Sequence, residues 1–315
     1  MKIKAIFNRD GGTFRTTDMA AYEARVEQVF RDAGHDIDAE VVSGDEMQAA
    51  LERAAGRDDL DAMIAGGGDG TISAAAGLAW KSGMPLGIVP AGTMNLFARS
   101  LKLPLDIVEV LDVLAHGRII DADIGSADGR AFVHQFSTGL HARMVRYRNS
   151  LSYASRIGKI SASVRAAIAV ILNPPQFDVD IDVDGVRERR RISAISVSNN
   201  PFGRDTLMYA DDVTSGRLGF YTAPPLTPFG VARLSVDILR GKFRDSPVIT
   251  EMSGSTVALH FPKVYGRINC VIDGELLPLD RRVTLRIHPG ELKLLVGAQA
   301  PPPTPVEDAQ ATSGA

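Results

Sequence analysis

The sequence has little cysteine, no metal-binding spacing of cysteine or histidine, and no long apolar run. Cys270 is the single cysteine among 315 residues, so an intramolecular disulfide is excluded and a reducing compartment is favoured. The 6 histidines form neither HExxH nor a paired pattern, which argues against a zinc site. No stretch of about 18 residues is continuously apolar, and the apolar run at the N-terminus is too short for a secretory signal. We therefore expect a cytoplasmic protein whose contact with a membrane is peripheral.

An excess of charge of one sign is also absent. The 35 Lys and Arg residues stand against 38 Asp and Glu residues, and a net charge of −3 argues against a general nucleic-acid binder. The content of 45% hydrophobic and 23% charged residues is typical of globular proteins. At 315 residues, two domains are the expected number.

The first part of the chain alternates short apolar runs with helical patterns, which is typical of a parallel sheet built from βαβ units. The predicted strands are Lys2 to Asn8, Ile37 to Val42, Leu60 to Ala65 and Leu86 to Val89. Helices are predicted around Tyr22 to Phe30 and over Asp45 to Ala55, Thr71 to Lys81, Asn95 to Ser100 and Asp106 to Ala115. The pattern predicts an α/β domain of the Rossmann-like kind.

A different pattern, with a period of two, begins near Asp123 and continues to Pro289, and it predicts a mainly antiparallel β domain. The predicted strands are Phe177 to Val183, Arg191 to Val197, Arg217 to Tyr221, Val257 to Phe261 and Val283 to Ile287. Asp184 and Gly185 mark a hairpin between two of these runs. Residues Leu151 to Leu172 show the spacing of an amphipathic helix. The proline-rich tail over 299–315 is predicted to be disordered.

The strongest local signal is the run Gly66-Gly67-Gly68-Asp69-Gly70-Thr71, between a predicted strand and a predicted helix. Glycines allow close approach of a ligand, and a helix N-terminus favours an anion such as phosphate. The run is neither a P-loop nor the dinucleotide G-x-G-x-x-G pattern. The alternative is a tight strand-to-helix turn in which Asp69 caps the helix.

Two more polar loops follow predicted strands. Pro90-Ala91-Gly92-Thr93-Met94-Asn95 comes after the fourth strand, and Asn8-Arg9-Asp10-Gly11-Gly12-Thr13 ends the first. Each could be a plain turn. Because carboxyl ends of parallel strands meet at one edge of a sheet, where open α/β sheets bind ligands, the three loops are expected to share one ligand.

These motifs, with VIDGE at 271–275, resemble the diacylglycerol kinase catalytic-domain family, which includes bacterial lipid kinases and sphingosine kinases and is distantly similar to NAD kinases. The resemblance extends to about Gly297. It implies an N-terminal ATP-binding domain over 1–122, joined by a returning segment at about 290–298, and a C-terminal β-sandwich domain over 123–289 that takes the lipid. It also implies ATP and Mg²⁺ as cofactors.

The resemblance assigns roles residue by residue. Asp273 matches the acid proposed as catalytic base, with Glu275 beside it, while Asp69 and Asp121 match acids near magnesium. With the three loops, the predicted nucleotide-binding residues are Asn8, Gly11, Gly12, Gly66, Gly67, Gly68, Asp69, Gly70, Thr71, Thr93 and Asn95. Phosphoryl transfer needs such a set: donors to the phosphates, a metal, and a carboxylate near the nucleophile. Without the other motifs, Asp273-Gly274 is also a plain hairpin turn.

Two positions depart from the family pattern. Leu96 follows Asn95 where the family commonly has aspartate, so one polar contact in the cleft is missing or comes from elsewhere. Some bacterial members hold a second, structural metal in an acidic loop, but here Ser215 stands where an acid is expected near Asp212. One carboxylate fewer weakens a site for a hard cation, so we do not expect tight metal binding there.

The segment from His141 to Leu172 is basic and has no acidic residue. Arg156, Lys159 and Arg165 on its predicted helix are expected to contact an anionic bilayer. The alternative is a solvated helix packed on the β domain.

The sequence thus predicts an ATP-dependent kinase of a lipid hydroxyl, acting on a diacylglycerol-like, phosphatidylglycerol-like or sphingoid substrate at a membrane surface and without nucleic acid. A NAD kinase-like enzyme and a catalytically inactive nucleotide- or lipid-binding regulator remain as alternatives. The number of subunits stays open, and a homodimer is one state that the sequence allows.

Overall fold

The computed structural model describes residues 1–150, 172–262 and 268–298. The elements of the N-terminal part are β1 (Lys2–Asn8), the 3₁₀ helix η1 (Gly12–Thr16), α1 (Met19–Asp32), β2 (Asp36–Val42), α2 (Gly44–Ala55), β3 (Ala62–Gly67), α3 (Asp69–Ser82), β4 (Leu86–Pro90), α4 (Leu96–Ser100), α5 (Glu109–Ala115) and β5 (Arg118–Ala127). They are followed by β6 (Arg130–Phe132), β7 (Gln135–Gly139), α6 (Leu140–Ser150), β8 (Phe177–Val183), β9 (Val186–Ile192), β10 (Ala194–Asn199), β11 (Leu218–Ala223), α8 (Pro228–Leu239), β12 (Thr250–Gly254), β13 (Thr256–His260), β14 (Ile268–Ile272), β15 (Glu275–Leu279) and β16 (Arg282–Val296).

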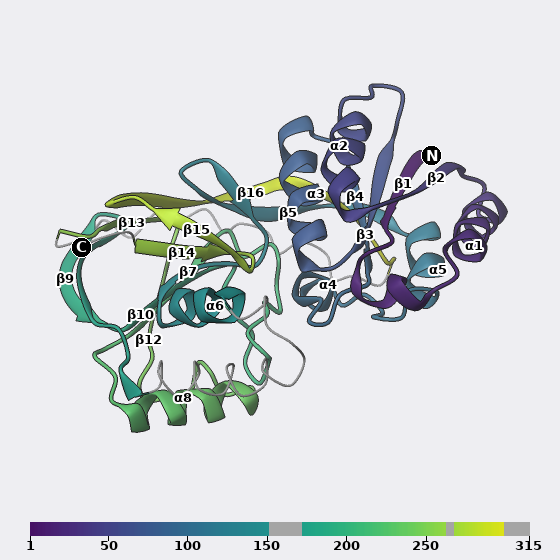
Figure 1. Ribbon diagram of the computed structural model, residues 1–315. Helices are drawn as coiled ribbons and strands as arrows, with labels where there is room; N and C mark the ends of the chain where they lie inside the picture. Colours follow the sequence, from purple (N-terminus) through teal and green to yellow (C-terminus); the bar gives the residue numbers. More distant parts are fainter. Residues whose placement is uncertain (151–171, 263–267, 299–315) are drawn as a thin grey trace, which may run out of the picture.

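The N-terminal part is a parallel sheet in the order β2-β1-β3-β4, with helices on both of its faces. Figure 1 shows α1 and α5 on one side of the sheet and α2 and α3 on the other. Local sequence explains α1: Asp18 accepts hydrogen bonds from the backbone N–H groups of Ala20 and Ala21, and the apolar residues at helical spacing face the core. The chain leaves α1 through Gly34, whose φ of 80° suits glycine.

The order of the strands fixes the position of the binding edge. From β1 the chain goes outward to β2, and it then returns past β1 to β3 and β4. The point between β1 and β3, where the order reverses, is the place at which open α/β sheets form a crevice at the carboxyl ends of their strands. The loop after Asn8 and the loop after Gly67 both lie there.

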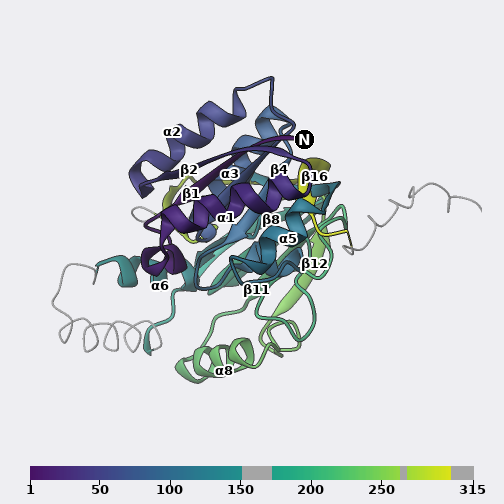
Figure 2. The ribbon, with the colours of Figure 1, turned by 90° about the vertical axis from the view of Figure 1, so that its right-hand side faces the viewer.

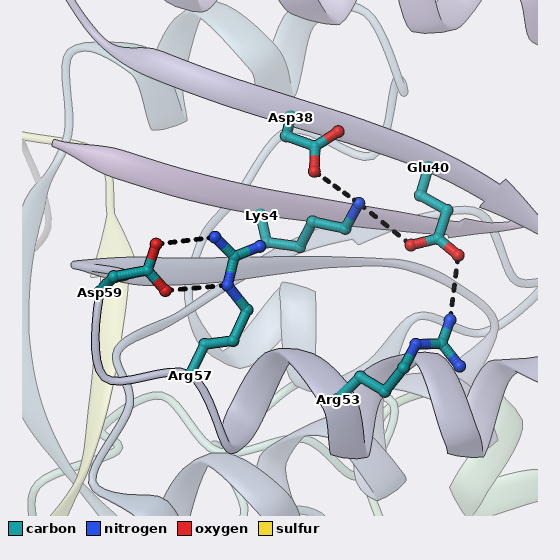
Figure 3. A network of polar contacts seen from close by, with 6 residues as sticks. All are labelled: Lys4, Asp38, Glu40, Arg53, Arg57 and Asp59. Atoms are coloured by element: carbon teal, nitrogen blue, oxygen red, sulfur yellow. Dashed lines mark hydrogen bonds and ion pairs between the residues drawn. The ribbon is translucent and has the colours of Figure 1, made fainter.

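A network of ion pairs connects α2 with the edge strand β2 and its neighbour β1 (Figure 3). Lys4 Nζ lies 2.8 Å from Asp38 Oδ2 and 3.0 Å from Glu40 Oε2, and Arg53 Nη2 lies 3.1 Å from Glu40 Oε1. Partial burial lowers the pKa of Lys4, but the two carboxylates outweigh it and raise that pKa above its ordinary value. Ion pairs near the surface contribute about 0–1 kcal/mol each, so the network adds modestly to the attachment of α2 to the sheet.

The C-terminal part is a sandwich of two sheets. One face comes from the far end of a ten-stranded sheet, with β16, β13, β8 and β9 in that order, and the other is a six-stranded sheet in the order β12-β11-β10-β7-β14-β15. Apolar residues from both sheets form the core between them, among them Phe136, Val179, Val197, Phe220 and Leu285. The predicted fold class, an α/β domain followed by an antiparallel β-sandwich, is therefore confirmed.

Two long strands connect the halves of the molecule. β5 and β16 pair in antiparallel fashion from Ala127–Leu285 to Arg118–Val296, and Leu294 of β16 also pairs in parallel with Leu86 of β4. The register shifts between His288 and Leu292, around Gly290 with a φ of 67°. In Figure 1 both strands run from the sandwich into the N-terminal sheet. The predicted domain limits at 122 and 290 fall inside these strands, so hydrogen-bonded strands join the halves.

One predicted strand was wrong. The chain expected to be extended from Arg191 to Val197 breaks at Ser193, and the strands on either side of this residue belong to different sheets. The buried Ser193 donates its N–H to the carbonyl of Ala223 and accepts the N–H of Leu140, which holds the crossing point. α6 and α8 were not predicted. The predicted helix over Leu151 to Leu172 and the tail over 299–315 lie outside the described residues, apart from Leu172.

Candidate active site

The loops after β1, β3 and β4 meet at one edge of the sheet. Thr13 donates its N–H to Ala91 O at 2.9 Å, and Ala91 donates its N–H to Gly67 O at 2.9 Å. Asn8 Nδ2 donates to Thr71 Oγ1 at 3.2 Å. The structure thus brings together the three loops that the sequence singled out.

The glycines of these loops fall into two groups. At some positions a side chain would collide with the protein, and at Gly68 it would not. A Cβ on Gly12 would collide with Ala91 O, and one on Gly66 would collide with the ring of Phe7, so these two positions serve the packing of the loops. On Gly92, a Cβ would lie 2.8 Å from Gly68 Cα. A Cβ on Gly68 would have its nearest neighbour, Gly92 Cα, at 3.7 Å, which is ordinary contact. Gly68 also has a φ of −80°, so neither space nor backbone requires glycine there.

The start of α3 can take an anion. The helix has 14 residues, and its N-cap is Gly68, which has no side chain that could cap the first N–H groups. The first N–H groups of a helix lack partners within the helix and carry partial positive charge, which favours phosphate. The open space at Gly68, next to these N–H groups, fits the close approach of such a group.

Asp69 and Asn95 hold two of the loops together. Asp69 Oδ2 accepts the N–H of Asn95 at 3.1 Å and its Oδ1 accepts the N–H of Leu96 at 2.8 Å, so this carboxylate caps α4 instead of its own helix. Asn95, at a φ of 49°, bonds Gly92 with both halves of its amide. Thr93 lies exposed at the tip of the same loop. Each Asp69 oxygen takes one hydrogen bond, which leaves acceptor capacity for another ligand.

Asp273 comes from the turn between β14 and β15 and accepts four hydrogen bonds. Its Oδ2 accepts from Ser73 Oγ at 2.6 Å and Val133 N at 2.9 Å, and its Oδ1 accepts from His134 N at 3.0 Å and Gln135 N at 2.9 Å. Burial raises the pKa of Asp273 above its ordinary value, against the opposing effect of these donors. Because Ser73 lies on α3, this hydrogen bond connects the Asp-Gly turn to the helix that starts at the glycine loop.

Glu275 points to another partner. Its Oε2 lies 2.6 Å from Arg130 Nη2, and both side chains are largely exposed. The two residues line a cavity of about 520 Å³ that Gly70, Ser73 and Asp273 also line. The predicted catalytic role of Glu275 stays a prediction.

In the run Ile120-Asp121-Ala122-Asp123, Asp121 is exposed and Asp123 is buried. Asp121 is exposed on β5, opposite Lys293 of β16, and its role at a metal stays a prediction. Asp123 is 2% exposed and accepts hydrogen bonds from Asn200 Nδ2 at 2.6 Å and from the N–H groups of Gly216 and Gly290 at 2.7 and 3.0 Å. Burial raises the pKa of Asp123.

Asp123 connects to the candidate base through backbone and amide groups. Its carbonyl accepts Asn199 Nδ2 at 3.0 Å, the N–H of Asn199 donates to His134 O at 2.9 Å, and the N–H of His134 donates to Asp273. Sequence reasoning missed Asp123, because strand alternation places it on the same side as Asp121 and does not show which of the two the neighbouring domain covers.

His134 is a further residue that the sequence did not single out. Its ring packs 5.7 Å from that of Phe202, between centroids, and burial lowers the pKa of His134 to about 4 although the charge of Asp69 acts in the opposite direction. The imidazole next to Asp69 is therefore neutral near pH 7. A single histidine in the short bend between β6 and β7 carries no signal that would have pointed to it.

The loop near Asp212 gives no acidic cluster. Within the described ranges, no three His, Cys, Asp or Glu side chains are grouped so as to hold a metal ion. Asp212 Oδ1 accepts the N–H and the hydroxyl of Thr214, and Ser215 Oγ accepts from Asn200 Nδ2 at 2.9 Å.

Two further observations concern the predicted membrane contact. Arg156, Lys159 and Arg165 lie outside the described residues. In the part of the chain that the structure describes, no helix is both long and apolar enough to cross a bilayer.

Fold and site together define a protein with an N-terminal α/β domain and a C-terminal β-sandwich, in which the helix that follows a glycine-rich loop is hydrogen-bonded to a half-buried carboxylate of the sandwich. Known proteins resemble this chain in sequence and in fold. Residues 2–127 match the diacylglycerol kinase catalytic domain, so the resemblance inferred from the motifs is confirmed. The chain is 29% identical over 170 residues to the diacylglycerol kinases of Staphylococcus aureus strains JH9 and Newman; the match covers 53% of this chain and 49% of each relative. The chain thus spans about half the length of these relatives.

Solved structures extend the likeness in fold to the second domain. A diacylglycerol kinase from Bacillus anthracis str. Sterne aligns with 95% of this chain and 98% of its own, at a TM-score of 0.66 and 16% identity. A candidate diacylglycerol kinase from the same strain aligns with 95% of this chain and 96% of its own, at a TM-score of 0.73 and 18% identity. At these identities the likeness concerns the fold.

Proposed function

We propose that this protein is an ATP-dependent lipid kinase, which transfers the γ-phosphoryl group of ATP to a hydroxyl of a membrane lipid of the diacylglycerol-like, phosphatidylglycerol-like or sphingoid kind. The observation that carries the proposal is the 2.6 Å hydrogen bond between Ser73 and Asp273. It joins a carboxylate of the second domain to the helix that begins at the glycine loop, which is the pairing of base and phosphate site that phosphoryl transfer needs.

In the proposed nucleotide site, the chain supplies backbone N–H donors and room for a phosphate group. Gly68 leaves room beside the first N–H groups of α3, and Asn8 and Thr71 close the loop on its other side. Asp69 is a carboxylate of this edge whose oxygens retain acceptor capacity. Asp69 would hold magnesium here, where the ion would offset the charge of the phosphates, and magnesium commonly uses only one or two protein carboxylates.

At the acceptor end, Asp273 would take the proton of the lipid hydroxyl. Three of its four donors are backbone N–H groups, which are fixed by the turn, while the fourth is the hydroxyl of Ser73, which can rotate. A substrate hydroxyl would therefore replace the Ser73 hydrogen bond at Oδ2. The raised pKa of Asp273 makes the carboxylate a better base than an exposed aspartate.

A panel of acceptors tests the proposal. The purified protein is incubated with radiolabelled ATP, Mg²⁺ and, separately, diacylglycerol, phosphatidylglycerol, ceramide, a sphingoid base and NAD, and the products are separated by chromatography. Label in a lipid is the expected result. Label in NAD would establish the NAD kinase-like alternative, and ATP binding without any labelled product would establish the inactive regulator.

Two substitutions then test the base. Asp273→Asn should lower turnover by about 10²–10⁴-fold, but it also turns an amide N–H₂ toward backbone donors, so its melting temperature must be measured beside it. Ser73→Ala leaves the carboxylate in place and removes a donor that lowers the pKa of Asp273. Because the base must be deprotonated, and because Ser73 bonds it only until the substrate hydroxyl takes its place, the acid limb of the pH profile of kcat/KM, which reports the free enzyme, should move to higher pH. An unchanged acid limb in Ser73→Ala would argue against Asp273 as the base.

A further inference from the structure

The helix α8 presents an apolar face to solvent. Phe229 is 77% exposed, Val236 43% and Leu239 78%, and with Ala232 they lie on one side of the helix at positions three to four residues apart. In both Figure 1 and Figure 2, α8 lies at the lower edge of the molecule.

The opposite face of α8 is firmly anchored. Val231 and Leu234 pack into a buried cluster with Tyr221 and Phe243. Thr227 caps the first turn by accepting the N–H of Gly230, and a proline stands at the helix start. Since the core is already filled from the other side, the exposed residues are not needed for folding.

The charged residues along this apolar face are mainly cationic. Arg233 and Arg240 line a shallow groove on this face with Phe229, Val236 and one acid, Asp237, and Lys242 follows the helix. Asp237 accepts the hydroxyl of Ser246 at 2.6 Å, is 19% exposed and lies 4.0 Å from Arg233 Nε, so it offsets part of the charge of one arginine. A cationic rim on a chain whose net charge is −3 is complementary to an anionic surface.

We propose that α8 is a membrane-docking helix, whose apolar face enters the interface of an anionic phospholipid bilayer while Arg233, Arg240 and Lys242 contact the head groups. An amphipathic helix with cations at the border of its apolar stripe binds bilayers in this way. The face of 12 residues is about 18 Å long and 10 Å wide, roughly 200 Å², while each partner in a stable protein interface contributes about 800 Å². A second copy of the chain is thus a poorer occupant. The proposal rests on the proposed function in that a lipid kinase must reach a bilayer.

Vesicle binding tests the proposal without nucleotide. The full chain is sedimented with vesicles of phosphatidylglycerol and phosphatidylcholine, and with phosphatidylcholine alone. Phe229→Gln and Leu239→Gln should each weaken binding to the anionic vesicles about tenfold, since each removes one side chain from the apolar layer. Arg240→Gln with Lys242→Gln should weaken it further and flatten the dependence on salt.

Val186→Gln is the matched control, because Val186 is 64% exposed on β9 and should not affect binding. Melting temperatures of all variants should stay near that of the unchanged protein, as surface substitutions usually change stability by less than about 0.5 kcal/mol. Vesicle binding by the α8 variants equal to that of the unchanged protein would overturn the proposal. A dimer of the unchanged protein that is lost in Phe229→Gln on sedimentation would also overturn it, because α8 would then be a contact between copies.

Kinase assays on detergent-dispersed lipid separate this proposal from the proposed function. The α8 variants should phosphorylate dispersed lipid as the unchanged protein does and lose activity only on vesicles. If no lipid were phosphorylated but vesicle binding still depended on α8, the docking proposal would be supported and the kinase proposal would be contradicted.

Discussion

Gly68 is the residue at which a substitution best separates ligand contact from folding. Its Cβ would have ordinary contacts within the protein and its φ of −80° suits alanine, so Gly68→Ala should keep the melting temperature. The added methyl group would occupy the space beside the first N–H groups of α3. We expect ATP affinity to fall at least tenfold, measured by calorimetry or by a fluorescent ATP analogue.

Gly12→Ala is the contrasting variant, because its Cβ collides with Ala91 O. Here we expect the melting temperature to fall together with the affinity. Unchanged ATP affinity in a folded Gly68→Ala protein would exclude the glycine loop as the phosphate site.

His134 gives a prediction about pH. Its pKa is about 4 in the folded protein and about 6.5 in the unfolded chain, which therefore binds more protons between these values. Stability should consequently fall as the pH falls through 6.5 toward 4, and the effect of His134 on the pH dependence should fade as the pH rises above 6.5. Between pH 7.5 and pH 5 the loss due to this residue is roughly 2 kcal/mol.

The measurement is the free energy of unfolding in urea at both pH values, for the unchanged protein and for His134→Gln. Glutamine stays polar but does not titrate, so the variant should lose roughly 2 kcal/mol less on acidification, by the same linkage. Identical losses in the two proteins would mean that the imidazole is not buried in neutral form.

Residues could be predicted from the sequence where a local motif marks them. Asp69 and Asp273 stand next to glycines at strand ends, and the structure brings both to the junction of the domains. Ser73, Asp123 and His134 carry no such mark, since their positions depend on contacts between segments far apart in the chain. Ser73 and Asp273, for example, are separated by 200 residues.

At the scale of elements, the strands and helices of the N-terminal sheet were predictable because each has its own start and stop signals. The break at Ser193 was not, because an alternating pattern continues through it and only the packing of two sheets decides where the chain crosses. β16 shows the same limit: Pro289 and Gly290 suggest an end, but the strand continues past them with a bulge, held by its long pairing with β5.

The crossing at Ser193 is testable. Ser193 Oγ accepts the N–H of Leu226 at 2.9 Å, and both residues are buried. Ser193→Ala leaves that N–H without an acceptor, so we expect a loss of about 1–3 kcal/mol in the free energy of unfolding. Ser235→Ala on the exposed side of α8 is the control and should change stability by less than about 0.5 kcal/mol. Equal stability of the two variants would show that the crossing does not depend on this hydrogen bond.

At the scale of the whole molecule, one sheet runs through both halves. The order from β2 to β9 is unbroken, and β16 contributes Leu292 and Leu294 to the N-terminal core and Val283 and Leu285 to the sandwich core. Because β16 belongs to both cores, we expect that unfolding of one core also unfolds the other. The sequence could indicate two domains, but it could not show that their sheets are continuous.

The chain carries a natural probe in each half for testing this. Trp80, the single tryptophan, lies on α3 and donates to Glu291 Oε2 at 2.7 Å. Cys270, the single cysteine, is buried in β14 of the other sheet, and burial raises the pKa of its thiol to about 11, so it should react only after unfolding. We expect Trp80 fluorescence and Cys270 labelling to report the same midpoint in urea.

Leu292→Ala sharpens this test, because Leu292 is fully buried in the N-terminal core and its truncation should cost about 2–5 kcal/mol. If β16 couples the two cores, the substitution should move both midpoints to the same lower urea concentration, although Cys270 lies in the other half. Val186→Gln, at an exposed position, should move neither. A Trp80 midpoint that falls in Leu292→Ala while the Cys270 midpoint stays in place would show that the two halves unfold independently, despite the sheet that they share.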